Sequence, residues 1–230
     1  MKRKFLPFVL FFIAVASIGQ TVNYNSSYFV EAYDANGNAF TSKKNPVAEG
    51  SPMFFDGWTK GQVRFKNGFL LKEVDLQFNL QDNSPYFRRD SIMYAFVDPI
   101  QEFRLFFKTK EGDTVFLFRC GYPETGFNSP ASFYQVLADG NNFQLLKYVT
   151  KSAQENYQYG QATRKIYKQA EQLYAYDVKK NRIVKVRKDR GALADAMADH
   201  STIIIRFAEE KKYKLKSEKE IIELVNLLNQ

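Results

Sequence analysis

Residues 57–80 read GWTKGQVRFKNGFLLKEVDLQFNL and carry the clearest structural signal in the chain. Apolar and polar residues alternate on both sides of Asn67-Gly68, from Val63 and Phe65 before it to Leu76 and Phe78 after it. A period of two places the apolar residues on one face of a strand and the polar residues on the other. Asn-Gly favours a two-residue type I′ turn, because both residues tolerate a positive φ. The segment therefore predicts a β-hairpin that continues into a meander.

The same alternation recurs along the chain as far as Val186 and Arg187, with turn-forming residues between the apolar runs. Regularly spaced turn signals are typical of antiparallel sheets, and the 22 Phe and 14 Tyr suit pleated, half-buried surfaces. We expect further strands at residues 86–89, 92–96, 103–107, 114–120, 133–138, 143–149, 173–178 and 182–187. Residues 150–163 are polar and are expected to form a loop. The predicted fold class is α+β and mainly β, an antiparallel meander (sandwich or barrel-like) with a small C-terminal helical segment.

The pattern changes to a helical one after residue 188. Asp189 is the expected N-cap for a helix over residues 192–197. Ser217 to Glu220 form a capping box in front of a second helix. Its apolar residues recur at helical spacing, and they are Ile221, Leu224, Val225 and Leu228. Residues 201–212 are ambiguous, because the β-branched run Thr202–Ile205 favours a strand on propensity.

The chain begins like an exported protein. Met1-Lys2-Arg3-Lys4 is a basic segment, the apolar run from Phe5 to Ala16 is too short for a membrane span, and small residues follow it. We expect cleavage before Gln20, and a mature chain without a transmembrane span. The predicted localisation is periplasmic or secreted, including a peripheral position at the outer membrane. The domain boundaries expected are 1–19 for the signal peptide, 20–52 for an N-terminal arm and loop, 53–187 for the β body and 188–230 for helices packed on it.

Few residues point to catalysis. Cys120 is the single cysteine and His200 the single histidine, so the chain can form neither an internal disulfide nor a thiolate metal cluster. No P-loop, dinucleotide fingerprint, nucleophile elbow or zincin helix is present in the sequence. Asp195 and Asp199 beside His200 are interpreted as a solvated helix end, rather than a metal site. We therefore expect no enzyme activity and no cofactor. Hydrolysis by dispersed carboxylates stays as the least favoured alternative.

Three aromatic residues are candidates for ligand binding. Trp58 follows Gly57 at the start of the hairpin, and Tyr86 and Tyr94 lie on the next two strands. Such rings could stack on a sugar or line a cavity, but a lone Trp beside a hairpin more often closes the end of a core. Core packing is the favoured interpretation.

The densest basic segment is the second candidate site, and its members are Lys179, Lys180, Arg182, Lys185, Arg187 and Lys188. The formal net charge of the chain is +8, and residues 151–230 hold 17 Lys and Arg against 11 Asp and Glu. One interpretation is a surface for an anionic partner such as lipid headgroups or acidic glycan. The favoured alternative is protection of an edge strand, where lysine deters pairing with other chains. Nucleic acid is not an expected partner.

Several segments resemble a family of uncharacterised exported β-rich proteins from Bacteroidetes bacteria. The similar segments are residues 49–53, 61–68, 74–79, 133–140 and 214–229, so the resemblance spans nearly the whole mature chain. It implies a β body followed by C-terminal helices, with residues 201–212 helical. It implies export but no particular activity.

These observations together favour a non-catalytic binding or structural protein of the cell envelope. The alternative is a lipid or glycan binder that uses an aromatic-lined cavity in the β body. A cavity with converging polar groups would favour the alternative, and a solid core without a cleft would favour a structural role.

Overall fold

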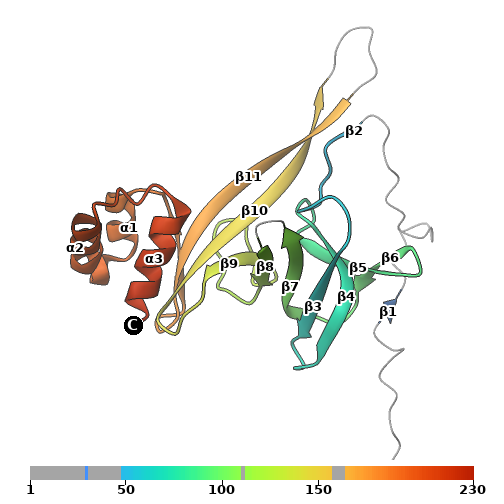
Figure 1. Cartoon of the computed structure of the whole chain (residues 1–230), viewed down its shortest axis with the longest axis horizontal. Helices are drawn as coiled ribbons and strands as arrows, with labels where there is room; N and C mark the ends of the chain where they lie inside the picture. The colour runs from blue at the N-terminus through green and yellow to red at the C-terminus, as the bar shows by residue number, and fades with distance from the viewer. Residues whose placement is uncertain (1–28, 31–47, 110–111, 157–163) are drawn as a thin grey trace, which may run out of the picture.

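A computed structural model describes residues 29–30, 48–109, 112–156 and 164–230. Within them, twelve strands form one sheet in the order β1-β6-β5-β4-β3-β7-β8-β9-β10-β11-β12, with β2 paired to β11 (Figure 1). The strands are β1 (Phe29–Val30), β2 (Ala48–Glu49), β3 (Thr59–Phe65), β4 (Leu70–Asn79), β5 (Ser84–Arg89), β6 (Ile92–Phe96), β7 (Ile100–Thr109), β8 (Gly112–Arg119), β9 (Tyr134–Ala138), β10 (Phe143–Asn156), β11 (Arg164–Asp177) and β12 (Arg182–Val186). Every pairing except β2 with β11 is antiparallel. The expected antiparallel meander is confirmed, and the described strands form an open sheet whose order ends at β1 and β12.

The hairpin β3–β4 is confirmed, but its turn differs from the expected type I′. The Phe65 N–H donates to the Phe69 carbonyl and the Gly68 N–H donates to the Phe65 carbonyl, so the loop has three residues. Gly68 has a φ of 88°, whereas Asn67 is not among the described residues with positive φ. Asn67 instead accepts a hydrogen bond from the Phe69 N–H through its side chain. This is the three-residue hairpin loop in which one glycine supplies the left-handed conformation.

The segment from β3 to β7 is strongly curled. Only Val97, Asp98 and Pro99 join β6 to β7, yet β5, β4 and β3 lie between these two strands in the sheet. Such a short connection is possible only if the sheet bends round until β6 and β7 approach each other. The rings of Phe65 and Phe96, from β3 and β6, lie 5.8 Å apart across the inside of this curl.

The concave face of the curl holds the larger aromatic core. Its least exposed rings are Phe65, Phe78, Phe87, Phe103 and Phe118, each about 1% exposed. Phe103 and Phe118 stack at 5.0 Å, and Phe78 packs at 4.7 Å from Phe118. The alternation predicted for β3 and β4 is confirmed, since Val63, Leu76 and Leu80 are fully buried beside these rings.

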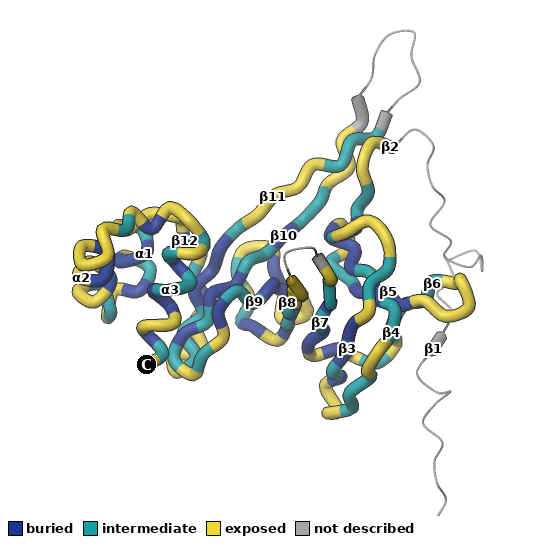
Figure 2. Tube along the Cα trace, viewed as in Figure 1, coloured by how far each residue is buried: buried dark blue, intermediate teal, exposed yellow. Residues whose placement is uncertain are grey.

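Strands β10 and β11 form a long hairpin that extends beyond the rest of the sheet (Figure 1). Their register is continuous over fourteen residue pairs, from Phe143 opposite Asp177 to Asn156 opposite Arg164. The expected loop at residues 150–163 is therefore wrong for 150–156, and 157–163 lie outside the described residues. The polar composition that suggested a loop reflects a strand pair whose distal faces are largely exposed (Figure 2).

The C-terminal helices lie at one end of the molecule against the base of this hairpin (Figures 1 and 2). They are α1 (Arg190–Ala196), the 3₁₀ turn η1 (Ala198–His200), α2 (Ser201–Lys211) and α3 (Glu218–Leu228). Asp189 caps α1 by accepting from the Ala192 N–H, and Ser217 caps α3 by accepting from the Glu220 N–H, as expected. The ambiguous segment 201–212 is thus helical over most of its length, because Ile204, Phe207 and Ala208 bury one helical face.

Residues 1–19, the expected signal peptide, and most of the expected arm 20–52 lie outside the described residues. None of the described helices has the length and apolar character that crossing a membrane requires. Strand β12 ends at Val186 and α1 begins at Arg190.

Candidate functional site

A cavity of about 270 Å³ opens at one end of the curled sheet. Its wall is formed where β3, β6 and β8 end and β5 and β7 begin, together with the loop that precedes β9. Most of the lining is apolar or aromatic, with Lys66 and Asp98 as its charged members; the full set is Lys66, Ser84, Pro85, Tyr86, Ala95, Phe96, Val97, Asp98, Pro99, Ile100, Cys120, Ala131 and Phe133. The cavity is open to solvent on one side, and a concave site lined by apolar and aromatic residues with some polar groups is a usual form of a small-ligand site.

Two polar side chains of the cavity wall are held in place by neighbouring groups. The Cys120 thiol is 7% exposed and donates to the Ile100 carbonyl at 3.1 Å. Burial raises its pKa, while the nearby Lys66 ammonium acts in the opposite direction. Tyr86 is 8% exposed and its hydroxyl donates to Asp82 at 3.2 Å. Burial and this carboxylate raise the pKa of Tyr86 to about 12, so the hydroxyl stays protonated at neutral pH.

The structure separates the three aromatic residues proposed as a ligand site. Tyr86 lines the cavity. Tyr94 is buried in the aromatic core, stacked on Phe87 at 5.2 Å, and Trp58 lies beneath the Arg88 guanidinium at 5.4 Å from the ring centre. Tyr86 pairs with Ala95, whereas Tyr94 pairs with the next residue, Phe87, so the two tyrosines point to opposite faces. Tyr94 is thus a core residue, Tyr86 lines the cavity, and Trp58, for which core packing was the favoured interpretation, is only partly buried.

The basic segment at residues 179–188 is partly neutralised within the chain. Lys180 forms an ion pair with Asp199, and Lys188 donates to Glu218 at 3.0 Å. Glu218 also accepts from Lys147 at 3.0 Å. Burial acts to raise the pKa of Glu218, but the hydrogen bonds from Lys188 and Lys147 outweigh it and hold the pKa below its ordinary value. Lys185 and Arg187 make no ion pair with any described residue.

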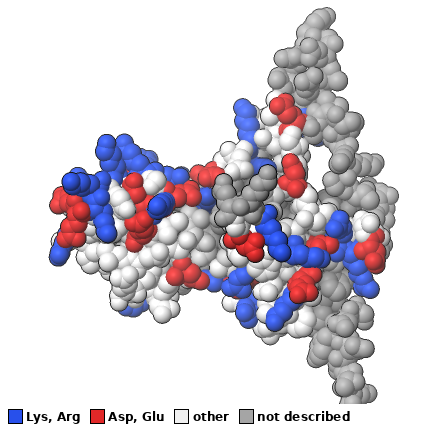
Figure 3. Space-filling model, in the orientation of Figure 1, with Lys and Arg blue, Asp and Glu red and all other residues white. Residues whose placement is uncertain are grey.

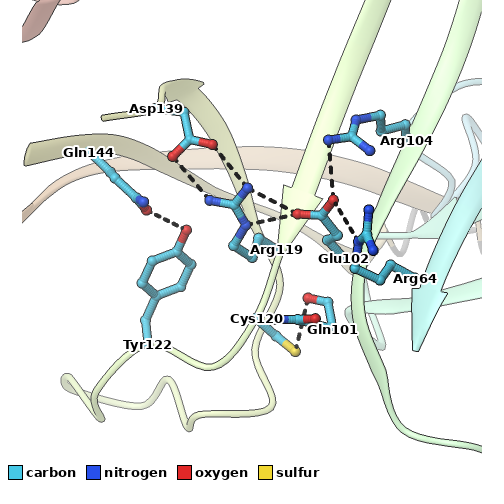
Figure 4. A network of polar contacts seen from close by, with 9 residues as sticks. All are labelled: Arg64, Gln101, Glu102, Arg104, Arg119, Cys120, Tyr122, Asp139 and Gln144. Atoms are coloured by element: carbon cyan, nitrogen blue, oxygen red, sulfur yellow. Dashed lines mark hydrogen bonds and ion pairs between the residues drawn. The ribbon is translucent and has the colours of Figure 1, made fainter. Parts of the chain in front are cut away.

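The densest charged network lies elsewhere, on the convex face of the curl, and is centred on Glu102 (Figure 4). Glu102 of β7 is 7% exposed and lies directly opposite Arg64 of β3 on one side and Arg119 of β8 on the other. Arg119 contacts one carboxylate oxygen at 2.9 Å, and Arg104 and Arg64 approach the other at 3.1 and 3.6 Å.

Arg119 is held by a second carboxylate. It donates two hydrogen bonds to Asp139, at 3.1 and 2.9 Å. Burial disfavours the charged form of Arg119, but the bonds to Asp139 and Glu102 outweigh this and keep its pKa above the ordinary value. The guanidinium is thus fixed between two carboxylates.

This network is not predicted by the sequence alone. Its only signal in the sequence is a charged residue at a polar position of each strand, as at Arg64, Glu102 and Arg119, which also describes any solvated face. The register that places the three opposite each other depends on pairing β3 with β7, two strands separated by the whole of β4 to β6. Local patterns do not specify such a long-range pairing.

His200 and Asp199 lie in η1, the 3₁₀ turn between α1 and α2. The His200 ring packs edge-on against Phe143 at 4.8 Å, and Asp199 pairs with Lys180. Among the described residues, no group of three or more His, Cys, Asp and Glu side chains is arranged to hold a metal ion.

Comparison with protein-family models, with curated proteins and with solved structures finds no match for this chain.

Proposed function

We propose that this chain is an exported, non-catalytic binding protein of the cell envelope that takes the apolar part of a small lipid or glycan ligand in the cavity at the end of the curl. The observation that carries the proposal is the cavity itself, which places Tyr86, Phe96 and Phe133 around one opening. Its volume of about 270 Å³ suits one short acyl chain or one sugar ring, rather than a large cofactor.

The wall is shaped by fixed contacts, which favours binding without rearrangement. The Phe133 N–H donates to the Asn83 side chain at 2.6 Å, and the same side chain donates back to the Phe133 carbonyl at 3.2 Å. Phe133 also packs at 5.2 Å from Phe103 of the core. A site built on such a framework loses little conformational entropy when it binds. Export remains a proposal that rests on the sequence of residues 1–20.

Native mass spectrometry of protein purified from its source cells tests the proposal. The wild-type protein should carry a discrete non-protein mass that organic solvent releases. Ala131→Phe places a ring at the mouth of the cavity, where Ala131 is exposed, and should remove this mass. Ala170→Phe is the matched control, since Ala170 is an exposed residue of β11 that is not part of the cavity wall, and it should leave the mass in place. The proposal would be contradicted if the wild-type protein carried no such mass, or if the two variants carried it in equal amounts.

A further inference from the structure

The charged network on the convex face continues across five neighbouring strands. Lys60 lies opposite Asp75, and Asp75 lies opposite Arg88 on the following strand. Asp75 contacts Lys60 at 2.6 Å and Arg88 at 3.1 Å. These three residues and the Glu102 network together are called the charged belt. Its members are Lys60, Arg64, Arg88, Arg104, Arg119, Asp75, Glu102 and Asp139. Figure 3 shows positive and negative side chains interleaved over this part of the sheet.

The belt has an excess of positive charge, and the excess is concentrated at two arginines. Five cations face three carboxylates, so the belt carries two uncompensated positive charges at neutral pH. Arg119 is engaged on both sides by Glu102 and Asp139. Arg64 and Arg104 share a single oxygen of Glu102, and that oxygen is their only ion-pair partner among the described residues.

These two guanidinium groups are also accessible. The side chain of Arg64 is 40% exposed and that of Arg104 is 32% exposed, against 9% for the Glu102 between them. A guanidinium has five N–H donors, so most donors of both residues are not used by the described chain. Both groups approach the same oxygen within 4 Å, so they lie close enough for one oxyanion to contact both. A planar guanidinium binds carboxylate and sulfate groups through paired hydrogen bonds.

We propose that Arg64 and Arg104, oriented by Glu102, bind the carboxylate or sulfate groups of an acidic polysaccharide that lies across the charged belt. The shape of the face favours a linear polyanion over a bilayer. The belt crosses β5, β4, β3, β7 and β8 on the outside of the curl, a path of about 19 Å along a convex surface. A flat membrane touches only part of a convex surface, whereas a flexible chain follows it. Arg64, Glu102 and Arg104 are not part of the cavity wall, which lies at the end of the curl.

Binding to polygalacturonate and to chondroitin sulfate, measured by titration calorimetry at low salt, tests this proposal. The wild-type protein should bind at least one of them, and Arg64→Gln/Arg104→Gln should weaken binding by about tenfold or more. Lys185→Gln/Arg187→Gln removes the same charge from the C-terminal part of the chain and should change affinity by less than about twofold. Circular dichroism checks that the variants fold. The single variant Arg64→Gln, which leaves Glu102 two guanidinium partners, should weaken binding in the same direction.

Three results would overturn the proposal. One is the lack of wild-type binding to either polysaccharide. Another is equal loss in the two double variants, which would indicate attraction to net charge alone. The third is binding to phosphatidylglycerol vesicles that Arg64→Gln/Arg104→Gln abolishes, with no binding to polysaccharide, which would assign the belt to a membrane surface.

Discussion

At the scale of single residues, Glu102 shows how one buried carboxylate organises a charged surface. It is almost completely withdrawn from water, yet three guanidinium groups surround it, from the same strand and from both neighbouring strands. A buried charge is costly unless hydrogen bonds and opposite charges compensate it. The carboxylate and the arginines therefore stabilise each other. Loss of the single carboxylate should be more destabilising than loss of one arginine, because Glu102 would still keep two guanidinium partners in the second case.

Glu102→Gln should lower the free energy of unfolding by about 2 kcal/mol, because a neutral amide leaves three positive groups close together. Asp75→Asn is the matched control on the same face. The partners of Asp75 are more exposed, so this substitution should lower the free energy of unfolding by less than about 1 kcal/mol. Denaturant unfolding of both variants measures the difference. Equal, small effects would show that the Glu102 network contributes no more than an ordinary surface ion pair.

At the scale of elements, α3 is an integral part of the fold, since it packs into a second apolar core that is formed by residues of β9 to β12 and of the C-terminal helices. Ile221, Leu224 and Val225 are fully buried against residues from the strands and the other helices. Asn229, just after α3, accepts from the Asn142 and Phe143 N–H groups and donates to the Phe143 carbonyl. The helix is thereby joined to the turn between β9 and β10.

Leu224→Ala and Leu227→Ala make a matched pair within α3. Leu224 is fully buried, so its truncation should cost about 3–5 kcal/mol of unfolding free energy, because a cavity is left behind. Leu227 is 38% exposed, so its truncation should lower the free energy of unfolding by no more than about 1 kcal/mol. Thermal and denaturant unfolding measure both. A small effect of Leu224→Ala would instead indicate a detachable helix.

The elements that the sequence predicted correctly are those with a local signal. Alternation around Asn67-Gly68 predicted β3 and β4, and the Ser217 cap with its apolar stripe predicted α3. For residues 201–212, β-strand propensity favoured a strand, but the segment is mostly helical. Its buried face is formed by Ile204 and Phe207, and the β-branched Ile203 and Ile205 are exposed. The continuation of β10 to Asn156 was missed since a projecting strand pair lacks a buried face.

At the scale of the whole molecule, the pairing of β3 with β7 has the largest consequence. It curls the sheet, and the curl creates both a concave face filled with phenylalanine and a convex face that carries the charged belt. The cavity lies where the curled strands end. No local pattern specifies this pairing. The sequence therefore offered an aromatic-lined cavity only as an alternative, without its position, and it did not predict the belt.

The most direct test of the binding function uses Cys120 as a reporter, since it is the only cysteine and lines the cavity. The rate of Cys120 alkylation by iodoacetamide can be measured on native protein from the source cells, before and after its bound molecules are removed by mild organic extraction. Circular dichroism confirms that the extracted protein remains folded. A ligand in the cavity shields the thiol, so we predict alkylation at least several-fold faster after extraction, and slow again once the extract is returned. Equal rates before and after extraction would contradict a ligand in this cavity.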